Sequence, residues 1–204
     1  LAELALPFSY EIIVVDNGGE ASEAFQGHCR ALQDKKQIAH HISNTQNLHF
    51  GYSRNQGILL STAPNYICIV DNDIMYRKYW LEKSIEGLEK YSDRKLIASP
   101  ISYPRTSRYV MERFEDYHTD MRAGSNCMVV PRKVFNEIGL FECHRVAGTR
   151  WQDRLVRAGY VTLVTDPPMV QDAGFKKGYE LKKERDHLKT MSTGLGILID
   201  KFPI

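Results

Sequence analysis

The chain has 204 residues, of which 43% are hydrophobic and 25% are charged, and this balance is typical of a globular domain. The formal net charge is +2, from 27 basic and 25 acidic side chains, which is too even to favour nucleic acid as the main partner. No apolar run approaches the roughly 18–20 residues that span a bilayer. No signal peptide is visible, although the first residue is not Met. We expect a location in the cytoplasm or at the inner face of a membrane.

The four cysteines form no C-x-x-C pair and include two, Cys68 and Cys127, that fall in strand-like apolar runs. We interpret them as small buried hydrophobic residues in a reducing compartment, and we predict neither a disulfide framework nor a zinc site.

Apolar runs alternate with helical patterns along the chain. The end of a helix is expected at 1–6, and strands are expected at 10–15, 37–43, 66–70, 95–99, 126–130 and 160–164. A helix is expected at 20–34, and a second helix opens from a polar loop and runs to about 61. Further helices are expected at 79–91, 131–139 and 151–158. Residues 103–122 are expected to form a surface excursion and 141–150 a loop. The alternation indicates an α/β fold with a mostly parallel central sheet.

The strand expected at Tyr66–Val70 ends at two carboxylates, Asp71 and Asp73, one residue apart. Because unpaired buried carboxylates are costly, we expect both acids in a crevice at the carboxyl end of this strand, where α/β sheets place ligands. Their oxygens suit Mg²⁺ or Mn²⁺, held also by a substrate's phosphates. The alternative is a solvated turn in which the acids cap a helix starting near Arg77.

Six segments together resemble the GT-A glycosyltransferases of the family 2 type. They are Ile12–Gly18, the Asn47–Gly57 helix start with Gly51, Arg54 and Asn55, the Asp71–Asp73 D-x-D, Asn126–Glu142, Trp151–Tyr160 and Val170–Asp172. Departures from the family pattern are Gly19 for Ser, Ser53 for Ala, Gln152 for the first acid of the E-D motif and Asp172 for a His. The resemblance covers nearly the whole chain and implies a Rossmann-like three-layer α/β/α sandwich.

The resemblance also implies a division of the chain. A glycosyltransferase domain would cover 1–175, with a nucleotide-binding part up to about 100 and an acceptor part after it. A basic helical appendage would follow at 176–204. The family's first strand, which lies between the strands expected at 10–15 and 66–70, has no counterpart here. We therefore predict that these two strands are separated by a gap or by a foreign strand, and are not hydrogen-bonded to each other.

The resemblance assigns donor-binding roles to four residues. Asp16 would accept the N3–H of a uracil ring; the alternative is an Asx turn with Gly18. Arg54 would donate to base or phosphate oxygens, or else form an ordinary surface salt bridge. Asp71 would hydrogen-bond the ribose, and Asn72 belongs to the same segment.

Two further acids would hold the metal, and a third acid would act as the general base. Asp73 would ligate the divalent ion, with Asp172 as a possible second ligand or else a plain loop acid. Asp153 is the candidate general base, since a buried carboxylate can have its pKa raised toward working pH; the alternative is a helix-start acid favoured by the helix dipole. Trp151 would stack on the acceptor sugar, with core packing as the competing interpretation.

The resemblance therefore implies an inverting, metal-dependent hexosyltransferase that uses a nucleotide sugar, and the role of Asp16 favours a UDP-sugar. A polysaccharide, glycolipid or protein glycan would be the acceptor. A nucleotidyltransferase-like enzyme and a catalytically inactive nucleotide- or sugar-binding module are the alternatives. The basic C-terminal tail is either a solvated helix or a peripheral contact with an anionic membrane surface, and an oligomer is possible.

Overall fold

A computed structural model of the chain describes residues 8–18, 23–72, 74–100, 110–122, 124–143 and 147–172. The helix end expected at 1–6 and the basic appendage expected at 176–204 lie outside these residues, so the proposed domain boundaries remain predictions. No helix in the described ranges is both long enough and apolar enough to cross a bilayer.

The described chain alternates between strands and helices, as the sequence predicts. The strands are β1 Ile13–Asp16, β2 His40–Ser43, β3 Tyr66–Val70, β4 Ile74–Tyr76, β5 Leu96–Ala98, β6 Val110–Arg113, β7 Tyr117–Asp120, β8 Cys127–Pro131, β9 Val161–Thr165 and β10 Val170–Asp172. The helices are α1 Glu23–Asp34, α2 Phe50–Leu60, α3 Trp80–Lys90, α4 Arg132–Ile138 and α5 Ala147–Arg157.

Among the described residues, the largest sheet has six strands in the order β3-β8-β5-β9-β7-β6. Only β5 and β9 run parallel in it, and its other neighbours are antiparallel. The expectation of a mostly parallel sheet is therefore wrong for this part of the fold, where the sheet is mixed. Parallel pairing is found between β1 and β2, which form a separate pair with Ile13 opposite His40.

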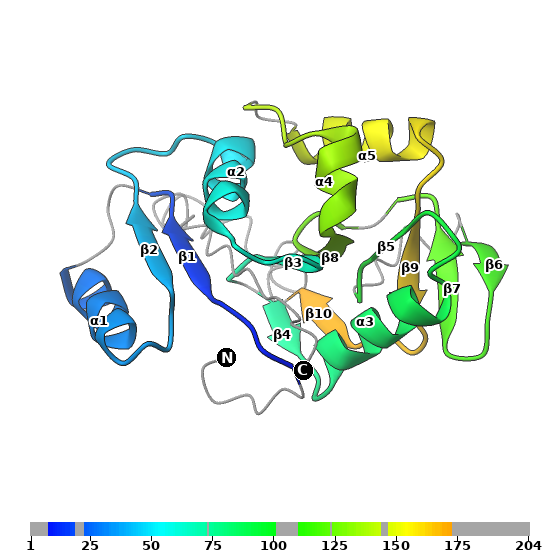
Figure 1. Cartoon of the computed structure of the whole chain (residues 1–204), viewed down its shortest axis with the longest axis horizontal. Helices are drawn as coiled ribbons and strands as arrows, with labels where there is room; N and C mark the ends of the chain where they lie inside the picture. Colours follow the sequence, from blue (N-terminus) through cyan, green and yellow to red (C-terminus); the bar gives the residue numbers. More distant parts are fainter. Residues whose placement is uncertain are drawn as a thin grey trace, which may run out of the picture.

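Strands β1 and β3 are not hydrogen-bonded to each other in the described structure, which confirms the predicted separation. In Figure 1 the two strands are drawn apart from each other, β1 beside β2 and β3 beside β8. Their side chains are nevertheless in phase. Ile13 and Ile67 belong to one apolar core, whereas Val14 and Cys68 belong to the other. Two strands whose alternate residues face the same two layers are oriented as members of one sheet.

Helices cover both faces and complete the α/β/α layering (Figure 1). On one face, Ile58 of α2, Phe135 of α4 and Trp151 of α5 form a core with the side chains of β1, β3 and β8 that point toward these helices. On the opposite face, α3 contributes Trp80, Leu81, Ile85 and Leu88, the predicted apolar stripe of that helix.

Two regions differ from the sequence expectation. The excursion expected at 103–122 contains the hairpin β6–β7, and Tyr117–Asp120 of β7 is buried between β6 and β9. The apolar pattern of the sequence did not predict this strand, because three of its four buried side chains are polar. The loop expected at 141–150 gives way to α5 at Ala147. The short pair β4–β10 was not expected either.

Candidate functional site

The Arg54 guanidinium and the Asp71 carboxylate form an ion pair. Arg54 Nη2 lies 2.6 Å from Asp71 Oδ1, and the two side chains are 5% and 26% exposed. Arg54 comes from the first turns of α2, and Asp71 directly follows β3. The structure therefore brings together two residues that the sequence assigned separately to the donor. The surface salt bridge considered for Arg54 does not describe this pair, because the arginine is buried.

Two other groups hold the Arg54 side chain in place. Its Nη1 donates to the carbonyl oxygen of Ser125, and its guanidinium carbon lies 3.4 Å from the centre of the Phe50 ring. The loop between β7 and β8 is further tied to the same place by the Asp71 amide, which donates to the Asn126 carbonyl over 2.8 Å. A planar cation stacked on an aromatic ring has little rotational freedom. Arg54 thus fixes Asp71 at the end of β3.

The remaining residues of the α2 motif fix the helix itself. Asn55 makes two hydrogen bonds to the backbone of Phe141, donating to its carbonyl over 2.7 Å and accepting from its amide over 3.0 Å. At Gly51 a Cβ atom would overlap the carbonyl oxygen of Glu142 and come within 2.8 Å of the Ala147 Cβ. Asn55 therefore anchors α2 to the segment before α5, and Gly51 allows α2 to lie close to the start of α5.

Asp16 is fully buried at the carboxyl end of β1. Its Oδ1 accepts the amide of Gly18 over 3.1 Å, which is the Asx-turn contact considered as the alternative to uracil recognition. Its Oδ2 accepts only a long bond of 3.4 Å from the Ser43 hydroxyl, and no cation pairs with it in the described chain. The carboxylate therefore keeps capacity to accept a further N–H donor.

Burial keeps the neighbours of Asp16 uncharged. It raises the pKa of the Cys29 thiol, and the Asp16 carboxylate raises that pKa further. It lowers the pKa of His41, although the Asp16 charge acts in the opposite direction. Both shifts favour the neutral side chain, so the thiol stays protonated and His41 is not a cationic partner.

An amide network, which the sequence did not predict, links β1 to α2. Asn44 Nδ2 donates to Asn17 Oδ1 over 3.2 Å and to Gln56 Oε1 over 2.9 Å. Asn17 in turn donates to Asn47 Oδ1 over 3.1 Å and accepts from the amide of Leu48. Asn17 and Asn47 lie in two of the segments that carry the family resemblance, but nothing in the sequence indicated that they contact each other. The network holds the ends of β1 and β2 against the helix that presents Arg54.

Asp153 lies on α5, and its side chain is 34% exposed. It forms an ion pair with Arg122, in the loop between β7 and β8 that also contains Ser125. The candidate base is thus tied to the loop that touches Arg54, while it stays accessible from solvent. The neighbouring Gln152, which replaces the expected acid, is buried.

The expectation that Trp151 stacks on an acceptor sugar is corrected by its surroundings. Its side chain is fully buried, and its rings lie 5.3 Å from Phe135 and 4.7 Å from Phe141 between centroids. The indole N–H donates to the Gly139 carbonyl over 2.8 Å. Core packing therefore describes this residue, and its faces are closed to a ligand in this structure.

The candidate metal ligands are only partly described. Asp73 lies outside the described residues, and for Asp172 the backbone alone is described. That backbone is informative, because β10 pairs with β4 so that Asp172 lies opposite Ile74, the residue after Asp73. Opposite residues of an antiparallel pair lie about 4.5–5.5 Å apart between Cα atoms. The pairing therefore places the backbone of Asp172 beside the strand that begins directly after the D-x-D segment. Asn72 is exposed beside them.

The sequence profile of glycosyl transferase family 2 matches residues 4–139, which is more than half of the chain. This chain belongs to glycosyl transferase family 2. The matched residues contain Asp16, Arg54 and Asp71, whereas Asp153 and Asp172 lie beyond them. No curated protein matches the chain by sequence.

Two solved structures have the same fold at low sequence identity. A structure of GalNAc-T7 with UDP, GalNAc and Mn²⁺ aligns with a TM-score of 0.60 and 11% identity over 78% of this chain and 36% of that chain. The mannosyltransferase PcManGT from Pyrobaculum calidifontis, in complex with GDP-Man and Mn²⁺, aligns with a TM-score of 0.57 and 14% identity over 76% of this chain and 46% of that chain. The chain thus has the GT-A fold and spans less than half of either protein.

Proposed function

We propose that this protein transfers a sugar from a nucleotide-sugar donor, a UDP-sugar in the first instance, to a hydroxyl group of a glycan or lipid-linked acceptor. The observation that carries the proposal is the Arg54–Asp71 pair at the carboxyl end of β3, in a chain that belongs to glycosyl transferase family 2. Carboxyl ends of strands are where α/β sheets place their ligands. Support for the class of donor comes from the ligands of the two structural relatives, UDP and GDP-Man.

Asp16 would select the base: its Oδ2 oxygen would accept the N3–H of uracil while Oδ1 holds the turn at Gly18. For this contact the residues that cover the carboxylate must move aside, since Asp16 is fully buried here. Asp71 would accept a ribose hydroxyl. Arg54 would keep that carboxylate in position, and its charge would favour a nearby diphosphate. Asn72, exposed next to Asp71, would contact the same nucleotide.

Asp73 and Asp172 would hold a divalent ion, Mn²⁺ or Mg²⁺; Asp172 pairs in β10 with β4, the strand that directly follows Asp73 in the sequence. Such an ion would supply charge to neutralise a departing nucleotide diphosphate. Both relatives contain Mn²⁺.

Asp153 would remove the proton from the attacking hydroxyl. The acceptor oxygen forms a bond to the anomeric carbon, the bond from that carbon to the diphosphate breaks, and the proton passes to the Asp153 carboxylate. One displacement by one base inverts the configuration at the anomeric carbon. For this step Arg122 must release the carboxylate or leave one oxygen free, since it pairs with Asp153 here.

Hydrolysis of a panel of UDP- and GDP-sugars with and without Mn²⁺ tests the proposal. We expect metal-dependent release of nucleotide that Asp73→Asn abolishes and Asp153→Asn lowers strongly, with folding preserved. Nucleotide release that is the same with and without Mn²⁺, and in both variants, would contradict the assigned roles. Donor binding without turnover would favour a catalytically inactive module, for which the buried Gln152 in place of an acid is the supporting observation. Release of pyrophosphate from a nucleoside triphosphate would favour a nucleotidyltransferase.

We further propose that the protein is cytoplasmic and contacts the inner face of a membrane through its basic tail, in keeping with lipid-linked acceptors and polysaccharide biosynthesis. The tail contains Lys176, Lys177, Lys182, Lys183, Arg185 and Lys189. Basic residues near an anionic surface contribute about 1 kcal/mol each. Sedimentation with phosphatidylglycerol vesicles, but not with phosphatidylcholine vesicles, is the expected result, and equal sedimentation with both would contradict it.

A further inference from the structure

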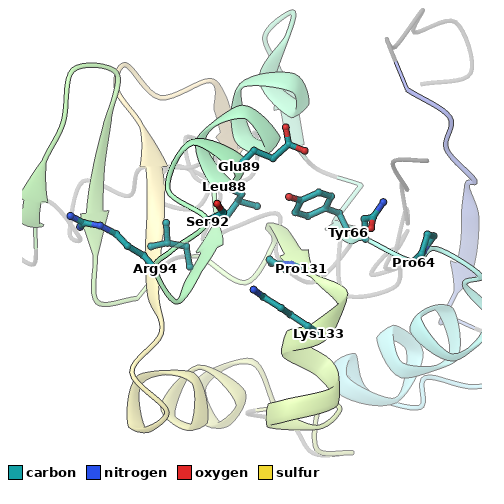
Figure 2. Close-up of a pocket in the computed structure, with 10 residues that line it drawn as sticks. Pro64, Tyr66, Leu88, Glu89, Ser92, Arg94, Pro131 and Lys133 are labelled. Atoms are coloured by element: carbon teal, nitrogen blue, oxygen red, sulfur yellow. The ribbon is translucent and has the colours of Figure 1, made fainter. Parts of the chain in front are cut away.

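A cavity of about 500 Å³ opens at the end of β3 opposite to Asp71. It lies where β3 begins, β8 ends and α3 ends, and residues of all three elements line it (Figure 2). Tyr66 and Asp71 are separated by the length of a five-residue strand, about 17 Å at the usual rise per residue. The cavity is therefore distinct from the site at the Arg54–Asp71 pair. Its size falls in the range of small-ligand pockets.

Apolar surface forms one side of the cavity. The ring of Tyr66, the side chain of Leu88 and the ring of Pro131 line it, and in Figure 2 the Tyr66 hydroxyl points toward Leu88 and Ser92. Tyr66 is only partly buried by its neighbours. A partly open aromatic ring beside proline and leucine can pack against the C–H face of a ligand ring.

Polar groups of both hydrogen-bonding senses surround this apolar surface. Ser92 offers a hydroxyl that donates and accepts, Lys133 is exposed and offers an ammonium, and Glu89 contributes a carboxylate. In Figure 2 the Lys133 side chain extends from α4 toward the cavity. The phenol of Tyr66 stays protonated, because burial and the charge of Glu89 raise its pKa.

The charges around the cavity are balanced. Arg94, a lining residue, is neutralised by Glu112 through two hydrogen bonds of 2.5 and 3.3 Å. Lys133 and Glu89, which also line the cavity, carry opposite charges. An anion such as a phosphate would gain little net attraction here, and an apolar ligand would leave the polar groups unpaired. A neutral ligand with many hydroxyl groups and an apolar ring face satisfies both requirements.

We propose that this cavity, lined by Tyr66, Leu88, Ser92, Arg94, Pro131 and Lys133, is a second carbohydrate-binding site that takes a neutral saccharide. It binds sugar away from the nucleotide and does not depend on the proposed transferase activity. Such a site would hold a distant part of a glycan chain, or a free saccharide.

The test uses the full chain without nucleotide or metal, and a panel of neutral oligosaccharides of glucose, galactose, mannose and N-acetylglucosamine. Backbone amide shifts in the ¹H–¹⁵N spectrum locate the binding. We expect at least one saccharide to shift residues around 66, 92 and 133, and Ser92→Ala with Lys133→Ala to weaken its binding about fivefold or more, the size of one or two lost hydrogen bonds. Lys35→Ala, an exposed lysine after α1, is the control and should not change the affinity.

Absence of any saccharide-dependent shift at these residues would overturn the proposal, as would stronger binding of inorganic phosphate at the same residues. Shifts confined to residues around 16 and 71 would also overturn it, because they would place the sugar in the donor site. A protein that binds saccharide here and hydrolyses no nucleotide sugar would keep this inference and refute the proposed function. Comparing single sugars with longer chains separates a free saccharide from a segment of a glycan.

Discussion

Arg54 and Asp71 are 17 positions apart in the sequence, yet they form a 2.6 Å ion pair in which the arginine is almost completely buried. The pair connects the first turns of α2 to the end of β3, and the Ser125 carbonyl and the Phe50 ring complete the surroundings of the guanidinium. Loss of one partner from such a pair leaves a poorly solvated charge, so the pair has consequences for stability as well as for the donor site.

Arg54→Leu is expected to lower the free energy of unfolding by about 2–4 kcal/mol, less than the full range for buried pairs because Asp71 is partly exposed. Urea unfolding measures this change. The control is Arg113→Leu, which removes an ion pair of similar chemistry with Asp166 whose members are 65% and 43% exposed. That variant should lose less than about 1 kcal/mol. Equal losses in the two variants would show that burial of Arg54 does not matter.

Two glycines in helices should respond in opposite directions to alanine. Gly51→Ala inserts a Cβ into the backbone of Glu142 and should destabilise the protein; overpacking costs about 1–3 kcal/mol. Gly27→Ala, inside α1, meets nothing within 4 Å and should stabilise it by about 0.5–1 kcal/mol through helix propensity. Thermal unfolding of both variants checks the signs. A stable Gly51→Ala would mean that α2 and α5 are not in close contact.

Sequence reasoning recovered β3 to the residue, because a short apolar run is bounded by turn residues before it and by acids after it. It missed β7, where His118, Thr119 and Asp120 are buried despite being polar. The neighbouring strands β6 and β9 cause that burial. The residues next to β7 in the sequence give no sign of this pairing. Likewise, motif positions identified Arg54 and Asp71, but their pairing with each other depends on how α2 packs and has no signature in the spacing.

Substitutions of Trp151 distinguish a role in core packing from a role in binding the acceptor sugar. Trp151→Ala should lower the stability by about 3–5 kcal/mol, the usual cost of truncating a large buried side chain. Trp151→Phe should cost less, since it keeps an aromatic ring beside Phe135 and Phe141 and loses the hydrogen bond to Gly139. Chemical denaturation of the two variants measures both losses. Unchanged stability together with a raised KM for the acceptor would instead restore the stacking role.

The gap between β1 and β3 predicts a hydrogen-exchange pattern. In an antiparallel pair only alternate residues of a strand exchange hydrogen bonds with the partner. Every second amide of Ile67–Val70 should therefore be protected by β8, whereas the others face the gap and should exchange faster. The central strand β5, paired on both sides by β8 and β9, is the internal reference. Uniform slow exchange along β3 would show that another strand occupies the gap.

Convergence of the carboxyl ends of β1 and β3 with α5 around one metal–nucleotide complex is the central claim, and paramagnetic broadening by Mn²⁺ in the presence of UDP tests it most directly. Compared with Mg²⁺ and UDP, we expect Mn²⁺ and UDP to broaden the amide signals of residues near Asp16, Asp71, Asp172 and Asp153, and to spare those around Ser92 at the opposite end of the sheet. Broadening that requires UDP and weakens in Asp73→Asn would support the site. Broadening that leaves the β1 and α5 signals sharp would contradict it.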